Sequence, residues 1–221
     1  MNAPSDARPA FPRGDSGFRA LDVSPAHRGV EQPAGEKGEH DMKGTIVRCL
    51  EELVRDNHGD EKWEEILTKA GHDADREFVS SEDVPDGDAV KMIGTTAEVL
   101  GISAEAAMEA FGIHWSTTYA PSIYDSYFQK ASNAREFLLS LDGIHVTITS
   151  TMANARPPRF TYDESDPARL VMNYDSSRGL VALMPGLAKG IGQYYGEEVE
   201  VSLDGNAVKI EFKAEQYMKA S

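Results

Sequence analysis

The chain is poor in cysteine, with Cys49 as the single example among 221 residues. One thiol excludes an intramolecular disulfide and any metal site that needs several thiolate ligands, such as a zinc finger or an iron–sulfur cluster. The sequence also lacks an apolar run near the ~20 residues that cross a membrane, and its N-terminus lacks the apolar core of a signal peptide. These absences predict a reduced, cytoplasmic protein that does not enter a membrane.

Positive charge is scarce as well. Lysine and arginine total 22 against 37 aspartates and glutamates, which gives a net charge of −15. A surface this acidic repels phosphate backbones, and the sequence shows no basic patch to offset it, so we expect no nucleic-acid binding. Hydrophobic residues make up 40% of the chain, enough for the core of one ordinary globular domain.

The two ends of the chain lack periodic structure. Residues 1–41 hold five of the eleven prolines and show neither a helical nor a strand period, which predicts a flexible tail with Met42 as an alternative start. Residues 216–221 are interpreted as a short C-terminal tail. We therefore expect one folded domain over residues 42–215.

Helical periodicity dominates the next hundred or so residues. Apolar side chains such as Ile46, Leu50 and Leu53 fall on one face of a first helix. A third helix is expected to start at Ser80-Ser81 and to bury Val90. Segment by segment, the pattern predicts a first helix from 46 that ends at Asn57 and Gly59 and a second from 63 that closes near Gly71. Further helices are expected over 81–100, 103–111 and 133–148, with an irregular stretch over 112–132 that includes a short helix at 124–130.

The pattern changes to strands after Pro157-Pro158. An Asp166-Pro167 turn and an Asp204-Gly205-Asn206 turn each lie between two alternating segments, which predicts two hairpins. Helices first and an antiparallel sheet later indicate the α+β class. The expected elements are strands over 159–164, 169–174, 179–183, 199–203 and 207–212, and a helix over 187–195.

Motifs of common enzymes are missing. Gly186, Gly190 and Gly192 resemble a phosphate loop only superficially, because no Gly-Lys-Ser/Thr ending follows them. We interpret these glycines as small residues that allow close helix packing. No nucleophile elbow and no HExxH motif occurs, so we predict that the protein is not an enzyme.

His145 is the unusual histidine, because it lies on the apolar helical face that carries Leu141 and Ile148. Such a histidine is usually hydrogen-bonded within a core. The alternative is an axial ligand of haem iron, which a neutral imidazole in an apolar slot can provide. His114, in the sequence Phe-Gly-Ile-His-Trp, is interpreted as a packed core histidine and is the second candidate ligand.

A second polar feature follows in the strand region. Tyr174, Ser176 and Arg178 alternate along the chain, so in a strand their side chains would share one face. Two hydroxyls and a guanidinium together suit a pair of carboxylates such as the propionates of haem. The alternative is an exposed polar strand face with no ligand.

Taken together, these features resemble the H-NOX family, the haem nitric oxide/oxygen binding domains related to the haem domain of soluble guanylate cyclase. The similarity covers about residues 42–213, and it implies a haem cleft between a helical N-terminal part and a mixed C-terminal part. It is carried by Met42-Lys-Gly-Thr-Ile-Val47, Leu141-Asp-Gly-Ile-His145, Pro157-Pro158-Arg159 and Tyr174-x-Ser176-x-Arg178.

The resemblance implies a role for each matching residue around haem b. His145 would be the proximal iron ligand. Tyr174, Ser176 and Arg178 would hold the propionates. The remaining contacts would come from Pro158, Leu141 and Ile144 on the proximal side and from Ile46, Leu50, Leu183 and Leu187 in the distal pocket.

The resemblance also implies which gas is sensed. Some family members bind oxygen through a distal tyrosine, and the aligned position here is Leu183, five residues after Arg178. An apolar pocket predicts a nitric oxide sensor that discriminates against oxygen, with carbon monoxide as a further candidate ligand. Tyr194 or Tyr195 would enter the pocket if the register were different.

Zinc is not predicted. Some family members carry a cysteine-rich zinc site in the C-terminal part, and this sequence has no cysteine after Cys49. We interpret Cys49 itself as a small packed hydrophobe, with a redox or nitrosation role as the alternative.

The output of the sensor is expected to reach another protein. We expect that the chain has no room for an effector domain, so movement of the helix carrying His145 would signal to a separate protein such as a histidine kinase or a cyclic-di-GMP enzyme. The alternatives are a haem-binding oxygen, storage or redox protein, and a module that keeps the fold without haem.

Overall fold

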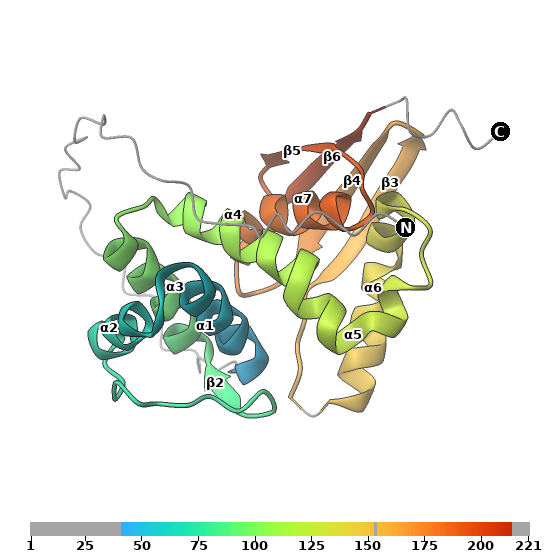
Figure 1. Cartoon of the computed structure of the whole chain (residues 1–221). Helices are drawn as coiled ribbons and strands as arrows, with labels where there is room; N and C mark the ends of the chain where they lie inside the picture. Colours follow the sequence, from blue (N-terminus) through green and yellow to red (C-terminus); the bar gives the residue numbers. More distant parts are fainter. Residues whose placement is uncertain (1–40, 153, 214–221) are drawn as a thin grey trace, which may run out of the picture.

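The computed structural model describes residues 41–152 and 154–213. Helices fill the N-terminal part, and other helices cover one face of an antiparallel sheet built by the C-terminal part (Figure 1). This arrangement confirms the α+β prediction. The expected tails, 1–41 and 216–221, lie outside the described residues except for Asp41, which already belongs to a strand.

Two of the helices begin at N-cap residues that the sequence pattern indicated. Ser103 Oγ accepts a hydrogen bond from the Ala106 amide, and Asn133 Oδ1 accepts one from the Glu136 amide, as expected of N-caps. The helical elements are α1 (Gly44–His58), α2 (Asp60–Ala70), α3 (Asp86–Leu100), α4 (Ala104–His114), the π-helical turn η1 (Trp115–Tyr119), α5 (Ala120–Phe128), α6 (Ala134–Thr151), the 3₁₀ turn η2 (Leu180–Leu183) and α7 (Met184–Tyr194).

Two predictions about α3 were wrong. Helix α3 starts at Asp86 and not at Ser80-Ser81, because residues 83–85 pair as a strand with residues 41–43. This start leaves the side chain of Val90 43% exposed, so it does not face the core as predicted.

Residues 112–132 were expected to be irregular apart from a short helix at 124–130, but residues 112–128 form a nearly continuous helical path. A π-helical turn adds one residue to the helical turn and breaks the regular spacing of apolar residues. The rings of Phe111, Trp115 and Tyr119 stack successively along this path, with centroids 6.3 and 5.6 Å apart.

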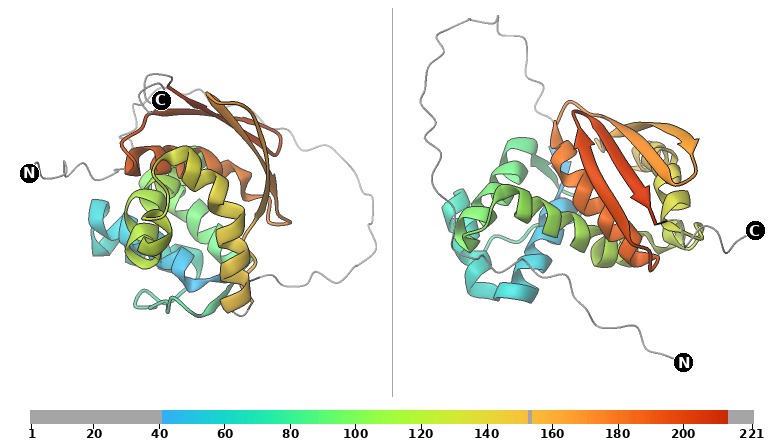
Figure 2. Two further views of the ribbon diagram at one scale, coloured as in Figure 1. Left: turned by 90° about the vertical axis from the view of Figure 1, so that its right-hand side faces the viewer. Right: turned by 90° about the horizontal axis from the view of Figure 1, so that it is seen from above.

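The larger sheet contains two antiparallel hairpins in the order β3-β4-β6-β5 (Figure 2). The segment 179–183, expected as a strand, instead contains the turn η2. Gly179, immediately before this turn, has a left-handed φ of 65°, which is incompatible with a strand. The strands are β1 (Asp41–Lys43), β2 (Asp83–Pro85), β3 (Arg159–Asp166), β4 (Arg169–Asp175), β5 (Val199–Asp204) and β6 (Ala207–Phe212), with β1 and β2 forming a separate small sheet.

The core has two parts. One lies among the N-terminal helices around Trp63 and Leu53, and the other lies beneath the larger sheet around Phe160 and Leu170. Trp115 packs against both parts and therefore connects them. No helix in the described part of the chain has the length and apolar character needed to cross a bilayer.

Helices α4 and α7 approach each other through glycines, which we call the glycine seam (Gly112, Gly186 and Gly190). A Cβ atom added to Gly186 would lie 2.4 Å from the carbonyl oxygen of Glu109. One added to Gly112 would lie 2.5 Å from the backbone nitrogen of Leu187. The seam bears out the interpretation of the Gly186 and Gly190 motif as a packing feature.

Candidate functional site

A mainly apolar cavity lies between the helical part and the elements that cover the sheet. Its walls come from helices of both parts of the molecule, from strands β1, β3 and β4, and from the segment that leads into β3. A cavity of this kind suits a flat apolar ligand with a few polar attachment points. Its apolar lining includes Ile46, Ile93, Phe111, Trp115, Phe128, Phe137, Leu141, Ile144, Leu183 and Leu187.

His145 lines this cavity from helix α6. Its Nδ1 atom lies 2.7 Å from the carbonyl oxygen of Pro158. Because a carbonyl can only accept, Nδ1 carries the proton and Nε2 keeps its lone pair, which is the form that binds a metal. Burial lowers the pKa of His145, which also favours the neutral ring.

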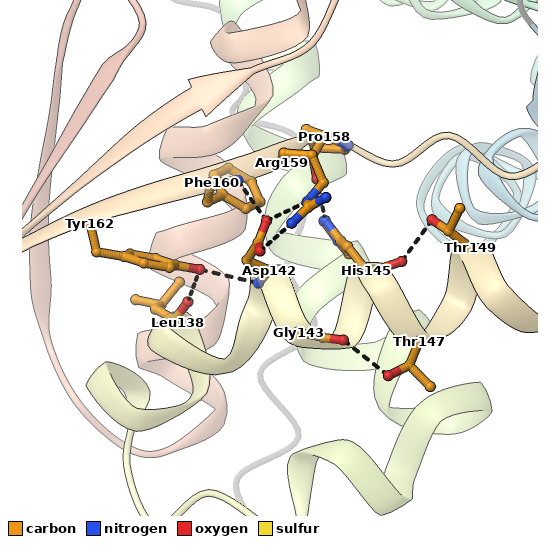
Figure 3. A network of polar contacts seen from close by, with 10 residues as sticks. All are labelled: Leu138, Asp142, Gly143, His145, Thr147, Thr149, Pro158, Arg159, Phe160 and Tyr162. Atoms are coloured by element: carbon orange, nitrogen blue, oxygen red, sulfur yellow. Dashed lines mark hydrogen bonds and ion pairs between the residues drawn. The ribbon is translucent and has the colours of Figure 1, made fainter.

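A polar network attaches α6 to the start of strand β3 (Figure 3). The Asp142 carboxylate accepts two hydrogen bonds from Arg159, at 2.7 and 2.8 Å, and a third from the Phe160 amide at 2.9 Å. These bonds lower the pKa of Asp142 to about 2. The network therefore fixes α6 to the start of β3 at Asp142, about one turn before His145. The hydrogen bond from His145 to Pro158 fixes the same helix to the residue just before β3.

The proximal residues predicted from the sequence come together in the fold. Leu141, Ile144 and Pro158 line the same cavity as His145, because helical spacing puts the first two on its face of α6 and the hydrogen bond to His145 holds Pro158 nearby. Their contacts with haem stay a prediction.

The polar trio is only partly assembled as predicted. Tyr174 and Arg178 line the cavity, whereas Ser176 is not among the lining residues. Strand β4 ends at Asp175, so the single strand face expected for the trio does not continue past Tyr174. Ser176 Oγ instead accepts a hydrogen bond of 3.3 Å from the Arg178 amide within a turn.

Arg178 is held by the N-terminal part of the chain. Its Nε atom lies 2.8 Å from a carboxylate oxygen of Asp86, and its Nη2 donates to the Asp41 carbonyl at 2.7 Å. A further bond runs to the carbonyl of Arg156. The guanidinium therefore connects both halves of the molecule at the cavity.

Three of the four predicted distal residues, Ile46, Leu183 and Leu187, line the cavity. Leu50 is not among the lining residues: it lies one helical turn beyond Ile46 on α1, where it is buried in the N-terminal core.

The alternative in which a late tyrosine enters the cavity is not supported. Tyr194 and Tyr195 are absent from the cavity lining, and Tyr195 Oη donates instead to the Phe128 carbonyl at 2.7 Å.

Sequence reasoning missed several polar and aromatic lining residues. Thr45, Trp115, Ser116, Tyr124 and Tyr127 all line the cavity. Burial raises the pKa of Tyr124, so its hydroxyl keeps its proton at neutral pH. The density of aromatic residues between positions 112 and 132 was the available signal. It was not used, because that stretch was expected to be largely irregular.

The other singled-out residues have structural surroundings. His114 is buried outside the cavity lining, with Nε2 3.0 Å from a Glu52 carboxylate oxygen, which supports its interpretation as a core histidine. Cys49 is fully buried, and burial raises the pKa of its thiol. Within residues 41–152 and 154–213, no group of three or more histidine, cysteine, aspartate or glutamate side chains is placed to hold a metal ion.

Residues 43–203 match the family model described as Haem-NO-binding. Among curated proteins, the chain is 27% identical to soluble guanylate cyclase gcy-32 of Caenorhabditis elegans over 157 residues, covering 69% of this chain and 23% of the relative. Soluble guanylate cyclase gcy-37 of the same organism is 28% identical, with 67% and 22% covered. The chain thus spans about a quarter of the length of these relatives.

Solved structures give the same match. An oxygen-binding H-NOX domain related to soluble guanylate cyclases, solved as its oxygen complex, superposes with a TM-score of 0.66 at 26% identity, covering 78% of this chain and 95% of that one. An H-NOX protein from S. oneidensis in the Fe(II)NO ligation state has a TM-score of 0.71 at 21% identity, with 78% and 99% covered, and shows likeness of fold.

Proposed function

The chain belongs to the Haem-NO-binding, or H-NOX, family, and from this premise we propose that it senses nitric oxide at a haem b iron ligated by His145. At the level of the family, the domain is a haem-binding gas sensor of the soluble guanylate cyclase type without catalytic activity, as the sequence predicted. The gas, the iron ligand and the partner are the proposed parts.

The single observation that carries the proposal is the hydrogen bond from His145 Nδ1 to the Pro158 carbonyl. It fixes the ring tautomer, so that Nε2 is the free coordinating atom, and it orients the imidazole. The ring belongs to a residue that lines an apolar cavity, where a neutral nitrogen ligand is favoured.

The chemistry of the cavity fits haem. Its aromatic and aliphatic walls match the porphyrin plane, and Tyr174 and Arg178 supply a hydroxyl and a guanidinium for the propionate groups. Ser176 would complete this set from the adjoining turn. His145 would hold the iron of the haem, and that iron would supply the binding site for a diatomic gas.

Selectivity for nitric oxide rests on the distal wall. Ile46, Leu183 and Leu187 offer no hydrogen-bond donor, and bound oxygen needs such a donor more than nitric oxide does. We expect carbon monoxide to bind as well, for the same reason. No zinc is part of the proposal.

The signal would leave through α6. Asp142 and His145 connect this helix to β3, so a change in the pull on His145 alters the contact between helix and sheet. A switch of this kind requires that the ligand interact differently with two conformations. The proposed recipient is a separate cytoplasmic signalling protein, such as a histidine kinase or a cyclic-di-GMP enzyme.

The direct test is the visible absorption spectrum of the purified, reduced protein under argon, in air and with nitric oxide. A histidine-ligated ferrous spectrum that is unchanged in air and shifts with nitric oxide is expected. A stable spectrum of an oxygen complex would overturn the selectivity, and the absence of a haem band after expression with haem would overturn the proposal.

The ligand assignment is tested by His145→Gly. We expect haem to be lost and to be restored by added imidazole. His114→Gln is the matched control, since His114 is a buried histidine outside the cavity lining, and it should keep the parent spectrum. An unchanged spectrum in His145→Gly, with a changed one in His114→Gln, would transfer the ligand role to His114.

One observation favours the alternative of an oxygen-binding protein. The side chain of Tyr124 lines the cavity, and its protonated hydroxyl is a potential donor to bound oxygen. If the parent protein forms a stable oxygen complex, Tyr124→Phe tests this source, because loss of the complex in the variant would identify Tyr124 as the donor.

A further inference from the structure

The side chain of Tyr162 on β3 contacts the backbone of α6 at an unusual place. Its hydroxyl donates to the Leu138 carbonyl at 3.1 Å and accepts from the Asp142 amide at 3.1 Å (Figure 3). These two backbone groups are the i and i+4 partners that bond to each other in a regular helix. A strand side chain therefore competes for one rung of the helical ladder, immediately before the segment that carries His145.

A glycine follows at the next position. Gly143 lies in the interior of α6, and a Cβ atom added there would have no neighbour within 4 Å. No close approach of another element therefore requires a glycine. Since glycine costs a helix interior about 1 kcal/mol relative to alanine, its effect here is to loosen the backbone beside Asp142.

The half of α6 beyond this point contains further competition for backbone groups. Thr147 Oγ1 donates to the Gly143 carbonyl, and Thr149 Oγ1 donates to the His145 carbonyl (Figure 3). Hydroxyl bonds of this type weaken and bend helices. Before the Tyr162 contact, by contrast, α6 is anchored by the buried side chains of Phe137 and Leu138.

We propose that Tyr162 is a positioning residue which, together with Gly143, makes residues 138–143 a hinge in α6. The half of the helix before the hinge stays packed beneath the sheet, and the half carrying His145 turns about it. This inference rests on the proposed sensing function and assigns the position at which the moving part of α6 begins.

The hinge explains how a small pull on His145 could move one half of α6 alone. The hydroxyl of Tyr162 can keep both backbone groups satisfied while the distance between them changes, because it acts as donor to one and acceptor to the other. A local opening of the ladder then leaves no buried backbone group without a partner.

Hydrogen–deuterium exchange on the full-length, haem-loaded, reduced protein, with and without nitric oxide, tests the hinge. Two variants act on it: Tyr162→Phe leaves the helical rung to close directly, and Gly143→Ala stiffens the next position. Each has a matched control. Tyr195→Phe removes another hydroxyl-to-carbonyl bond, and Gly94→Ala fills another helical glycine with open space around it.

In the parent protein, nitric oxide should accelerate exchange over residues 142–151 and leave residues 134–138 unchanged. Gly143→Ala should slow exchange over 142–151 about fivefold, the ratio that corresponds to ~1 kcal/mol of helix propensity. Both hinge variants should shrink the response to nitric oxide, and both controls should retain it. If Tyr162→Phe does not fold, Gly143→Ala and the parent protein still decide the question.

Two results would overturn the hinge. One is a response that spreads evenly over residues 134–151 or has its boundary outside 138–143, and the other is a parent-like response in both hinge variants. The absorption spectrum separates this failure from failure of the proposed function. A spectrum that shifts with nitric oxide while the exchange boundary is absent rejects the hinge alone, whereas a spectrum without any shift rejects the sensor and the hinge with it.

Discussion

Arg178 and Asp86 form an ion pair of 2.8 Å that joins the turn after β4 to the first residue of α3. Both side chains are largely buried, with 11% and 22% exposed. Arg178 lines the cavity, so the arginine proposed to hold a propionate also connects the two halves of the molecule.

Arg178→Ala should therefore accelerate haem loss. A buried propionate would lose a charge-assisted hydrogen bond worth about 1.5–3 kcal/mol, which corresponds to roughly a tenfold to hundredfold faster transfer of haem to an acceptor protein. Asp86→Asn keeps the guanidinium and should have a smaller effect on haem. Arg169→Ala, on the exposed end of β4, is the control, and equal haem retention in all variants would contradict the propionate role.

Acid stability should depend on Asp142. Its folded-state pKa of about 2 lies below the unfolded value near 3.9, so the folded protein binds fewer protons. The stability from this group is present above about pH 4 and is lost as the pH falls from about 4 to 2. Asp142→Asn should be less stable at neutral pH and should lose less in that window, as measured by urea midpoints at several pH values. The same profile in parent and variant would contradict this; exposed Asp73→Asn is the control.

His114 should make a contribution of the same sign at higher pH. Burial lowers the pKa of His114, against the opposing effect of Glu52 and Asp56. The folded protein therefore favours the neutral ring, and stability falls as the pH drops below the unfolded value near 6.5. His114→Gln should flatten this fall between about pH 6.5 and 5 in urea titrations. A steeper fall in His114→Gln than in the parent protein would contradict this prediction.

Gly186→Ala should destabilise the fold by about 1–3 kcal/mol, because the new methyl group would collide with the backbone of α4 at Glu109. The same substitution at Gly94, where nothing lies within 4 Å, should stabilise the protein by up to ~1 kcal/mol. Denaturant unfolding of the two variants measures both changes in the free energy of unfolding. Equal changes would show that helix propensity alone, and not the collision with Glu109, determines the effect of Gly186→Ala.

Leu183→Tyr tests the distal wall. A hydroxyl introduced at this cavity-lining position should stabilise bound oxygen, seen as a spectrum in air that the parent protein does not form. Ala182→Tyr is the matched control, since the neighbouring Ala182 is exposed and does not line the cavity. An oxygen complex in the control but not in Leu183→Tyr would show that the register is wrong.

Sequence periodicity was sufficient where one period governs a whole element. The N-caps Ser103 and Asn133 and the β5–β6 hairpin follow local rules, and the structure has them where they were expected. The prediction for residues 112–132 failed because a π-helical turn changes the period of the apolar residues. The predicted start of α3 was wrong because residues 83–85 pair with the strand at 41–43, and this pairing overrides the local capping signal.

In the candidate site, too, the features set by local spacing could be predicted and those set by tertiary contacts could not. His145, Leu141 and Ile144 could be grouped from helical spacing alone. The partner of His145 could not, because the Pro158 carbonyl is a backbone group that reaches it through tertiary structure. The bonds of Arg178 to Asp86 and Asp41 likewise join segments far apart in the chain, which no local pattern encodes.

The glycine seam has a consequence for building chimeras within the family. Gly186 on α7 meets the backbone of α4, and Gly112 on α4 meets the backbone of α7. At these positions each helix therefore packs directly against the backbone of the other, with no side chain between them. Exchanging α7 alone for one with larger residues would push the helices apart, and with them the wall that Leu187 contributes to the cavity. The two helices are therefore a single exchangeable unit, although residues 115–183 separate them in the chain.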